Sequence, residues 1–271
     1  MLIQKTSLAL ALALVAAVPA QAAISVASTG GTYTQSFDSL ANSGSAAVAW
    51  ANDSTLAGWS LFNKDSVAIA TYTADNGGSN AGSFRSYGAA GVAERALGGS
   101  ASGGTYFGSP ASNTVAGWIA VALNNDTGAA LSGFKLAFDG EQWRNGGNTA
   151  AQTMVLEYGF GASFATVASW TAPGGNFDFT SPVVGATAAA VDGNGAGLVA
   201  GRGGEVSTTW AAGDTLWVRW VEKNDAGNDH GLAIDNVSIQ AVSAVPEPST
   251  YAMLLAGLGC VGFIARRRKA A

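Results

Sequence analysis

The feature that most restricts the fold is the spacing of apolar residues between Ala23 and Ala244. They occur in short alternating or continuous runs, separated by Gly, Asn, Asp and Ser, and no long stretch has a helical period. Alternation with a period of two residues is typical of strands buried on one face. Glycine, at 37 of 271 residues, favours turns and argues against a helical bundle or coiled coil. Residues 23–244, here called the body, are therefore predicted to be all-β.

Ten short segments have the strand pattern, and together they predict a two-sheet antiparallel β-sandwich of the jelly-roll or concanavalin-like kind. Phe134, Leu136 and Phe138 share one face of a half-buried strand, whereas residues 215–221 are apolar on both faces and suit a central strand. Residues 95–115 and 185–205, rich in Gly, Ala and Ser, are expected to be long loops. The ten predicted strands are residues 33–37, 59–62, 67–73, 83–87, 118–123, 131–139, 153–158, 166–170, 215–221 and 232–240.

The first 22 residues have the three parts of a secretory signal peptide. Lys5 precedes an apolar run at residues 8–18, and Ala20-Gln21-Ala22 provides a small-x-small cleavage site. The run is too short to span a bilayer. Signal peptidase is therefore expected to cut after Ala22, and the body to be exported across the inner membrane.

The last 27 residues, 245–271, also have three parts in a fixed order. Pro246-Glu247-Pro248 is followed by an apolar stretch at residues 251–265 and then by Arg266, Arg267, Arg268 and Lys269. A helix that crosses a bilayer usually needs about 17–25 apolar residues, so the predicted transmembrane helix at residues 251–265 is short. The positive-inside rule places the basic tip in the cytoplasm and the body outside.

This order of parts resembles the PEP-CTERM sorting signal of Gram-negative bacteria that produce exopolysaccharide. The resemblance implies recognition by exosortase, cleavage near Pro246-Glu247-Pro248, and delivery from a transient membrane anchor to the cell surface or extracellular matrix. An ordinary single-pass anchor is the alternative. The body resembles a jelly-roll-type module of secreted bacterial proteins, a family with no assigned activity, in blocks at residues 36–40, 55–59, 140–144, 178–182 and 224–236.

The charge of the body argues against nucleic-acid binding, and its lack of cysteine excludes disulfide bonds. The body has 8 Lys and Arg against 17 Asp and Glu, a net charge of −9. Such a surface repels phosphate backbones, so nucleic acid is not an expected partner. The one cysteine, Cys260, lies in the apolar tail, so the body cannot contain a disulfide.

One polar segment could hold a metal ion. Asp225, Asn228, Asp229 and Asp235 supply hard oxygen ligands that suit Ca²⁺, so a structural calcium ion is the one cofactor considered. The alternative is a surface turn, because Asp, Asn and Gly also stabilise turns. His230, the sole histidine, excludes a multi-histidine zinc site and is expected to be structural.

Glu141, Trp143 and Arg144 are a second candidate site. An exposed Trp143 could stack on a sugar ring while its polar neighbours bind hydroxyl groups. The alternative is that Trp143 closes the end of the core and Arg144 pairs with an acidic residue.

No catalytic pattern stands out, and the protein is not expected to be an enzyme. There is no Gly-x-Ser-x-Gly motif and no Glu-x-Asp-x-x-Glu run. The expected function is a structural or adhesive role at the cell surface or in the matrix, associated with exopolysaccharide or a biofilm. A carbohydrate-binding module is the alternative, and a polysaccharide hydrolase or lyase is less favoured, because carboxylates could still meet from different strands.

Overall fold

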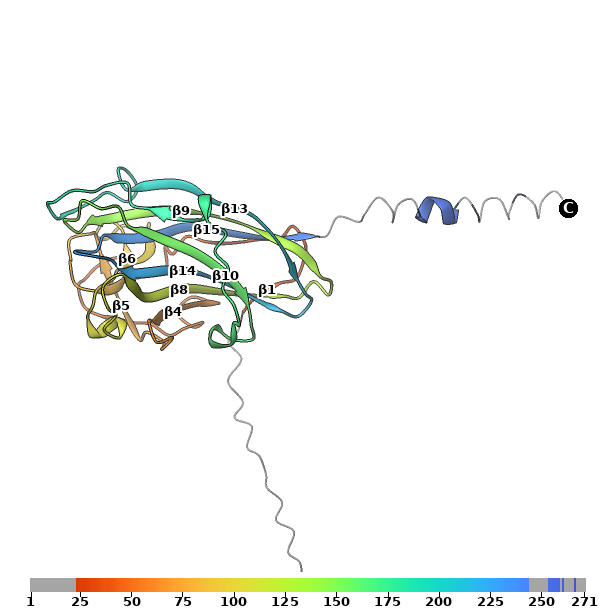
Figure 1. The fold of residues 1–271 in the computed structure, drawn as a ribbon, viewed down its shortest axis with the longest axis horizontal. Coiled ribbons are helices and arrows are strands. Elements are labelled where there is room, and N and C mark those ends of the chain that lie inside the picture. The colour runs from red at the N-terminus through yellow and green to blue at the C-terminus, as the bar shows by residue number, and fades with distance from the viewer. Residues whose placement is uncertain (1–22, 244–252, 259, 261–265, 267–271) are drawn as a thin grey trace, which may run out of the picture.

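The computed structural model describes residues 23–243, 253–258, 260 and 266. Within these residues, the body is a sandwich of two β-sheets (Figure 1). The first sheet has the order β1-β8-β14-β10-β11, and β4 also pairs with β8. Its strands are β1 (Ile24–Val26), β4 (Trp59–Asn63), β8 (Thr114–Asn125), β10 (Thr153–Phe160), β11 (Phe179–Thr180) and β14 (Thr215–Asn224).

The second sheet has nine strands in the order β12-β9-β15-β7-β6-β5-β3, with β13 paired to β9 and β2 paired to β15. Its strands are β2 (Thr32–Gln35), β3 (Val48–Ala49), β5 (Thr71–Asp75), β6 (Ser83–Tyr87), β7 (Ala96–Ser100), β9 (Leu131–Asn145), β12 (Ala189–Ala190), β13 (Leu198–Trp210) and β15 (Gly231–Ser243). The predicted sandwich is confirmed, but the sheets are not wholly antiparallel, because β1 pairs with β8 and β5 with β6 in parallel.

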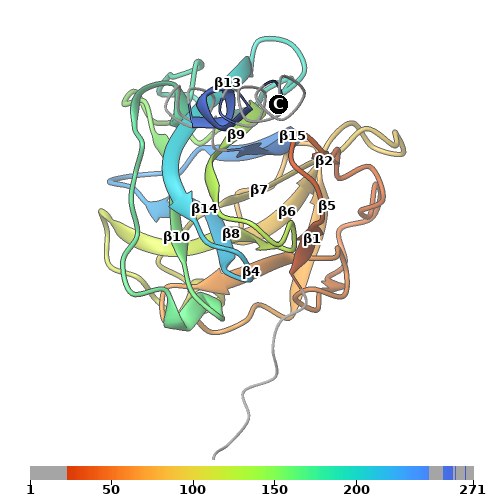
Figure 2. The same ribbon diagram turned by 90° about the vertical axis from the view of Figure 1, so that its right-hand side faces the viewer.

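The main core lies between the two sheets, which face each other in the end-on view of Figure 2. Phe134, Leu136 and Phe138 of β9 point into it, as their alternation predicts. In β14, Trp220 packs inward, whereas Trp217 belongs to a second apolar cluster with Phe164 and Trp118. Thus β14 is buried on both faces, and it lies between β8 and β10 as a central strand.

Two expectations about irregular segments are wrong. Residues 95–115 contain β7, and most of β13 falls within 185–205. Their Gly and Ala side chains give little hydrophobic signal, yet β7 pairs with β6 and β15, and β13 pairs with β9 apart from two irregularities in register. Residues 166–170 are not a strand: Thr166 ends a 3₁₀ turn, η2 (Phe164–Thr166), and residues 167–170 have no regular structure. The described residues also form 3₁₀ turns at η1 (Thr105–Phe107) and η3 (Gly175–Phe177).

The two targeting segments are described only in part. The signal peptide including Ala22, the Pro246-Glu247-Pro248 motif, and Arg267 and Arg268 lie outside the described residues. Residues 253–258 are helical, and Arg266 is helical and exposed. Within the described part of the chain, none of the helices combines the length and apolar content that crossing a bilayer requires.

Candidate functional site

The four predicted calcium ligands do not come together. The Asp229 carboxylate accepts a hydrogen bond from the Asp225 backbone N–H at 2.7 Å, and Asp225 pairs with Lys223 at 3.2 Å. Asn228 is exposed. Asp235 lies four residues beyond Gly231, where β15 begins. Four residues of an extended strand span about 13 Å. The expected four-residue calcium site is therefore wrong, because the extended strand separates Asp235 from the turn.

His230 packs against the backbone. Its Nδ1 accepts a hydrogen bond from the Gly146 N–H at 3.0 Å, and its Nε2 lies 3.2 Å from the Ala150 carbonyl oxygen. Burial lowers the pKa of His230. A neutral ring that donates from Nε2 to Ala150 satisfies both contacts, which fits the structural role expected of this residue.

Trp143 is not the exposed platform that its sequence context predicts. Its side chain is only 4% exposed, and its Nε1–H donates to the Glu141 carboxylate at 2.7 Å. Its ring lies parallel to that of Tyr87, and a Cβ at Gly193 would overlap the indole. The expectation is wrong because β9 continues through Asn145 and the turn at residues 192–197 covers its outer side.

Arg144, the third member of the predicted sugar site, fixes a neighbouring loop. Its guanidinium donates to the carbonyl oxygens of Gly77 and Gly78 at 2.9 and 3.1 Å. The predicted pairing with an acidic residue is thus replaced by backbone contacts.

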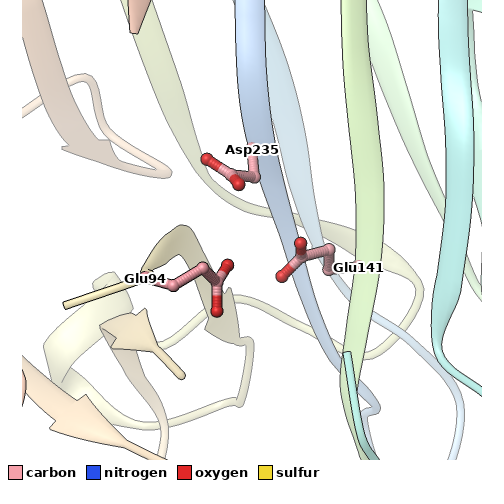
Figure 3. A group of neighbouring side chains, drawn as sticks. All are labelled: Glu94, Glu141 and Asp235. Carbon is pink, nitrogen blue, oxygen red and sulfur yellow. The ribbon is translucent and has the colours of Figure 1, made fainter. Parts of the chain in front are cut away.

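The most distinctive polar feature is a cluster of three acidic side chains, Glu94, Glu141 and Asp235, here called the carboxylate cluster (Figure 3). One oxygen from each residue lies within 4.8 Å of the others. Glu141 and Asp235 are 1% and 3% exposed, and Glu94 is half-buried. Acidic side chains are rarely so deeply buried unless they are paired.

Strand register brings two of these residues together. In the β9–β15 pair, Ala233 lies opposite Glu141, and Asp235 lies opposite Asp139. Residues two apart on a strand share a face, so Glu141 and Asp235 are diagonal neighbours. They occupy the face opposite to Ile234, which belongs to the main core. Glu94 approaches them from the 88–95 connection between β6 and β7.

Hydrogen bonds hold only part of each carboxylate. Glu94 Oε2 accepts from Asn194 Nδ2 at 2.6 Å, and Glu141 Oε2 accepts from Trp143 Nε1. The other Glu94 oxygen, Oε1, and Asp235 Oδ1 are buried without a hydrogen-bond partner. In contrast, both oxygens of neighbouring Asp139 are bonded, one to the Gly201 N–H and one to Asn236 Nδ2.

The cluster also affects proton affinity. Burial, with a smaller contribution from nearby carboxylates that include Glu94, raises the pKa of Glu141 to about 7 and that of Asp235 to about 8. Desolvation penalises the charged form of an acid, and nearby like charges add to that penalty. The arrangement can therefore hold protons or a hard cation among its oxygens.

The described part of the C-terminal segment has a different character. Met253, Leu254, Leu255 and Leu258 are all exposed, and Arg266 follows them. Residues 244–269 match the PEP-CTERM protein-sorting motif. A motif of this kind implies processing by exosortase, and proteins that carry it are exported and sorted to the cell surface.

Other comparisons add less. No curated protein matches the chain. Among solved structures, the chain is similar to the CBM22-1 xylan-binding domain from Paenibacillus barcinonensis Xyn10C, with 10% sequence identity and a TM-score of 0.38 over 81% of this chain and 100% of that domain. At this level of similarity, neither a ligand nor an activity carries over.

The body also has a polar pocket of about 290 Å³ at the end of the sandwich where β15 begins. It is lined by side chains that can exchange hydrogen bonds, among them Asn80, Arg144, Asn224, Asn228 and Asp229. Burial raises the pKa of Asp229 to about 7. Two of the predicted metal residues and one predicted sugar-binding residue thus meet here, in a combination that the sequence did not indicate.

Proposed function

We propose that this protein has a structural or adhesive role in the exopolysaccharide matrix or on the cell surface, and that it is not an enzyme. The observation that carries the proposal is the sorting motif at residues 244–269. A signal of this kind commits the chain to the cell exterior, where polysaccharide is the surrounding material. The structural or adhesive role is argued from the properties of the body.

The body suits release as an intact unit. The motif begins at residue 244, directly after β15 ends at Ser243, and the last buried core residue of the described chain is Ala241. Cleavage near Pro246-Glu247-Pro248 would therefore remove no strand and no part of that core. A stable, soluble body with a net charge of −9 is suited to persist in a hydrated matrix.

Two acidic side chains with raised pKa values and the one histidine of the chain are withheld from solvent. Glu141 and Asp235 are almost fully buried, and both ring nitrogens of His230 contact the backbone. A general acid or base must lie within hydrogen-bonding reach of its substrate. The arrangement supports a binding or structural role more than hydrolysis or elimination.

The localisation test uses the producing bacterium. We expect removal of residues 244–271 to send the body into the medium, whereas the complete chain accumulates at the surface or in the matrix. A strain without exosortase should mislocalise the complete chain as well, and loss of the protein should loosen the matrix. Unchanged location of the truncated chain would contradict the proposal.

A carbohydrate-binding role is the second candidate, and the end pocket favours it. Arg144 and the amide side chains that line this pocket can bind sugar hydroxyl groups. Arg144→Ala should reduce retention on the producer's own exopolysaccharide, measured well below the unfolding temperature. Lys135→Ala removes an exposed cation elsewhere on β9 and is the matched control. Equal retention of both variants would rule out binding through Arg144.

A further inference from the structure

We propose that Glu94, Glu141 and Asp235 form a Ca²⁺ site that ties the 88–95 connection to the outer face of β9 and β15. The site goes beyond the proposed function and does not depend on it. It also differs from the calcium site expected from the sequence, with which it shares only Asp235. Four features of the carboxylate cluster support it: spacing, unpaired oxygens, charge and ligand chemistry.

The spacing fits one ion. Ca²⁺ binds oxygen ligands at about 2.3–2.6 Å, so ligands on opposite sides of the ion are about 5 Å apart. One oxygen each from Glu94, Glu141 and Asp235 lies within 4.8 Å of the other two. All three carboxylates can therefore touch one central ion.

Two buried oxygens of the cluster have no hydrogen-bond partner. Asp235 is 3% exposed, yet its Oδ1 has no hydrogen-bond partner, and Glu94 Oε1 is likewise buried and unpartnered. Buried polar atoms are nearly always satisfied, so two such atoms in one cluster require an explanation. In Figure 3 the three carboxylates converge from separate parts of the chain on one small region. A cation that binds through these two oxygens would satisfy both.

In the described part of the chain, the carboxylate cluster lacks a salt-bridge partner, although the charge of Arg95 acts on Glu94 from a distance. Among the described residues, no Lys or Arg forms a salt bridge with any of its three carboxylates. The nearest guanidinium in sequence, that of Arg95, instead donates to Ser86 and to the carbonyl oxygens of Ala89 and Asp75. Two buried carboxylates and a half-buried one, with no salt bridge among the described residues, are costly to bring together, and a divalent ion offsets most of that charge.

The ligand chemistry selects calcium. All three donors are carboxylates, which suit hard cations, and no His or Cys belongs to the cluster. Mg²⁺ demands tighter octahedral geometry and usually keeps several waters, whereas Ca²⁺ tolerates irregular sets of six to eight oxygens. Water and second carboxylate oxygens can fill the remaining positions of a calcium ion.

The surrounding hydrogen bonds orient the proposed ligands. Trp143 holds one oxygen of Glu141, and Asn194 holds one oxygen of Glu94. Such outer contacts are typical of metal sites, where they fix the direction of each ligand. Since Asn194 lies in the turn at residues 192–197, the ion would secure this turn as well as the 88–95 connection.

The test measures thermal unfolding of the mature chain from Ala23, in detergent, with EDTA, with Ca²⁺ alone and with Mg²⁺ alone. A ligand that binds only the folded state raises the unfolding midpoint. We expect a rise with Ca²⁺ that exceeds the rise with Mg²⁺. Asp235→Asn and Glu141→Gln should each weaken Ca²⁺ binding at least about tenfold, as measured by calorimetric titration.

Because Asn is nearly isosteric with Asp, the proposal also predicts that the difference in unfolding temperature between Asp235→Asn and the wild type changes sign when Ca²⁺ is added. In EDTA, Asp235→Asn should unfold at a higher temperature than the wild type, because burying a carboxyl group beside two others costs free energy that a neutral amide avoids. In saturating Ca²⁺ it should unfold at a lower temperature than the wild type. This crossing distinguishes loss of a ligand from a simple folding defect, which would lower the midpoint in both conditions.

Two control variants complete the test. Glu205→Gln removes an exposed carboxylate on β13, and Asp229→Asn removes a carboxylate of the turn before β15. Both should keep the calcium response. The proposal is overturned if wild-type protein binds no Ca²⁺, if Asp235→Asn retains the response, or if Asp229→Asn alone loses it.

Discussion

At the scale of single residues, Trp143 links the sandwich to the carboxylate cluster. Its indole fills the space between Tyr87 and the turn at Gly193, and its Nε1–H orients Glu141. Trp143→Phe keeps an aromatic ring but removes the donor. We expect Ca²⁺ affinity to fall about 10–100-fold, the usual effect of losing an outer contact of a metal ligand.

Calorimetric titration of Trp143→Phe measures that loss. Trp170→Phe is the control, because Trp170 lies in the apolar cluster on the other sheet and contacts Arg219. Wild-type affinity in Trp143→Phe would show that the indole only fills space.

Glu222 supports a prediction about pH. It is buried in β14 with one oxygen unpartnered, and burial followed by the charges of Asp229 and Asp225 raises its pKa from 4.5 to about 8. Between these values the folded protein holds a proton that the unfolded chain has released. The free energy of unfolding should therefore fall as pH rises through this window.

Glu222→Gln removes that dependence. Relative to the wild type, its stability should rise between about pH 5 and about pH 9 by more than about 1.4 kcal/mol, the equivalent of a tenfold change in proton affinity. Denaturant unfolding at both pH values measures the difference. Glu205→Gln, at an exposed carboxylate, should show little change with pH. A constant difference for Glu222→Gln would contradict the raised pKa.

The site shows what residue types alone could predict. The sequence indicates both Glu141 and Asp235 as candidate site residues, but local spacing suggests partners close to each of them in the chain. Their proximity depends on the β9–β15 register, and Glu94 joins them through a connection between two other strands. No local spacing encodes these long-range relations, so the cluster required the folded structure.

At the scale of elements, apolar alternation identified most long strands but missed β7 and β13. Large apolar residues at alternate positions, such as Phe134, Leu136 and Phe138, indicate the buried face of a strand. In β7 the sequence is Ala-Leu-Gly-Gly-Ser, and small residues there reflect close backbone packing instead of a loop. A Cβ on Gly98 would overlap the Leu232 carbonyl oxygen and Ala233 of β15.

Gly98→Ala is therefore expected to destabilise the sandwich by about 1–3 kcal/mol, the usual cost of overpacking. Gly103→Ala is the matched control, since a Cβ there approaches no atom closer than 3.4 Å and should change stability by less than about 0.5 kcal/mol. Denaturant unfolding of both variants measures the contrast. Equal stability would show that β7 can move away from β15.

At the scale of the whole molecule, folding and targeting divide at the end of β15. The described core is complete by Ala241, and the sorting motif begins at residue 244. No disulfide can join the two parts, because Cys260 is the one cysteine of the chain. The body should therefore fold, and bind Ca²⁺, without the segment that directs its sorting.

Because the core ends before the sorting motif begins, removing the motif should not change the stability of the body or its response to Ca²⁺. Residues 23–243 and residues 23–271, compared in the same detergent, should unfold at the same temperature and gain the same increase from Ca²⁺. A reducing agent should change neither value, since the body contains no cysteine. Thermal unfolding followed by tryptophan fluorescence suits the comparison, because all eight tryptophans lie in the shared body. A lower midpoint for residues 23–243 would mean that the tail stabilises the sandwich, and cleavage by exosortase would then weaken the protein that it releases.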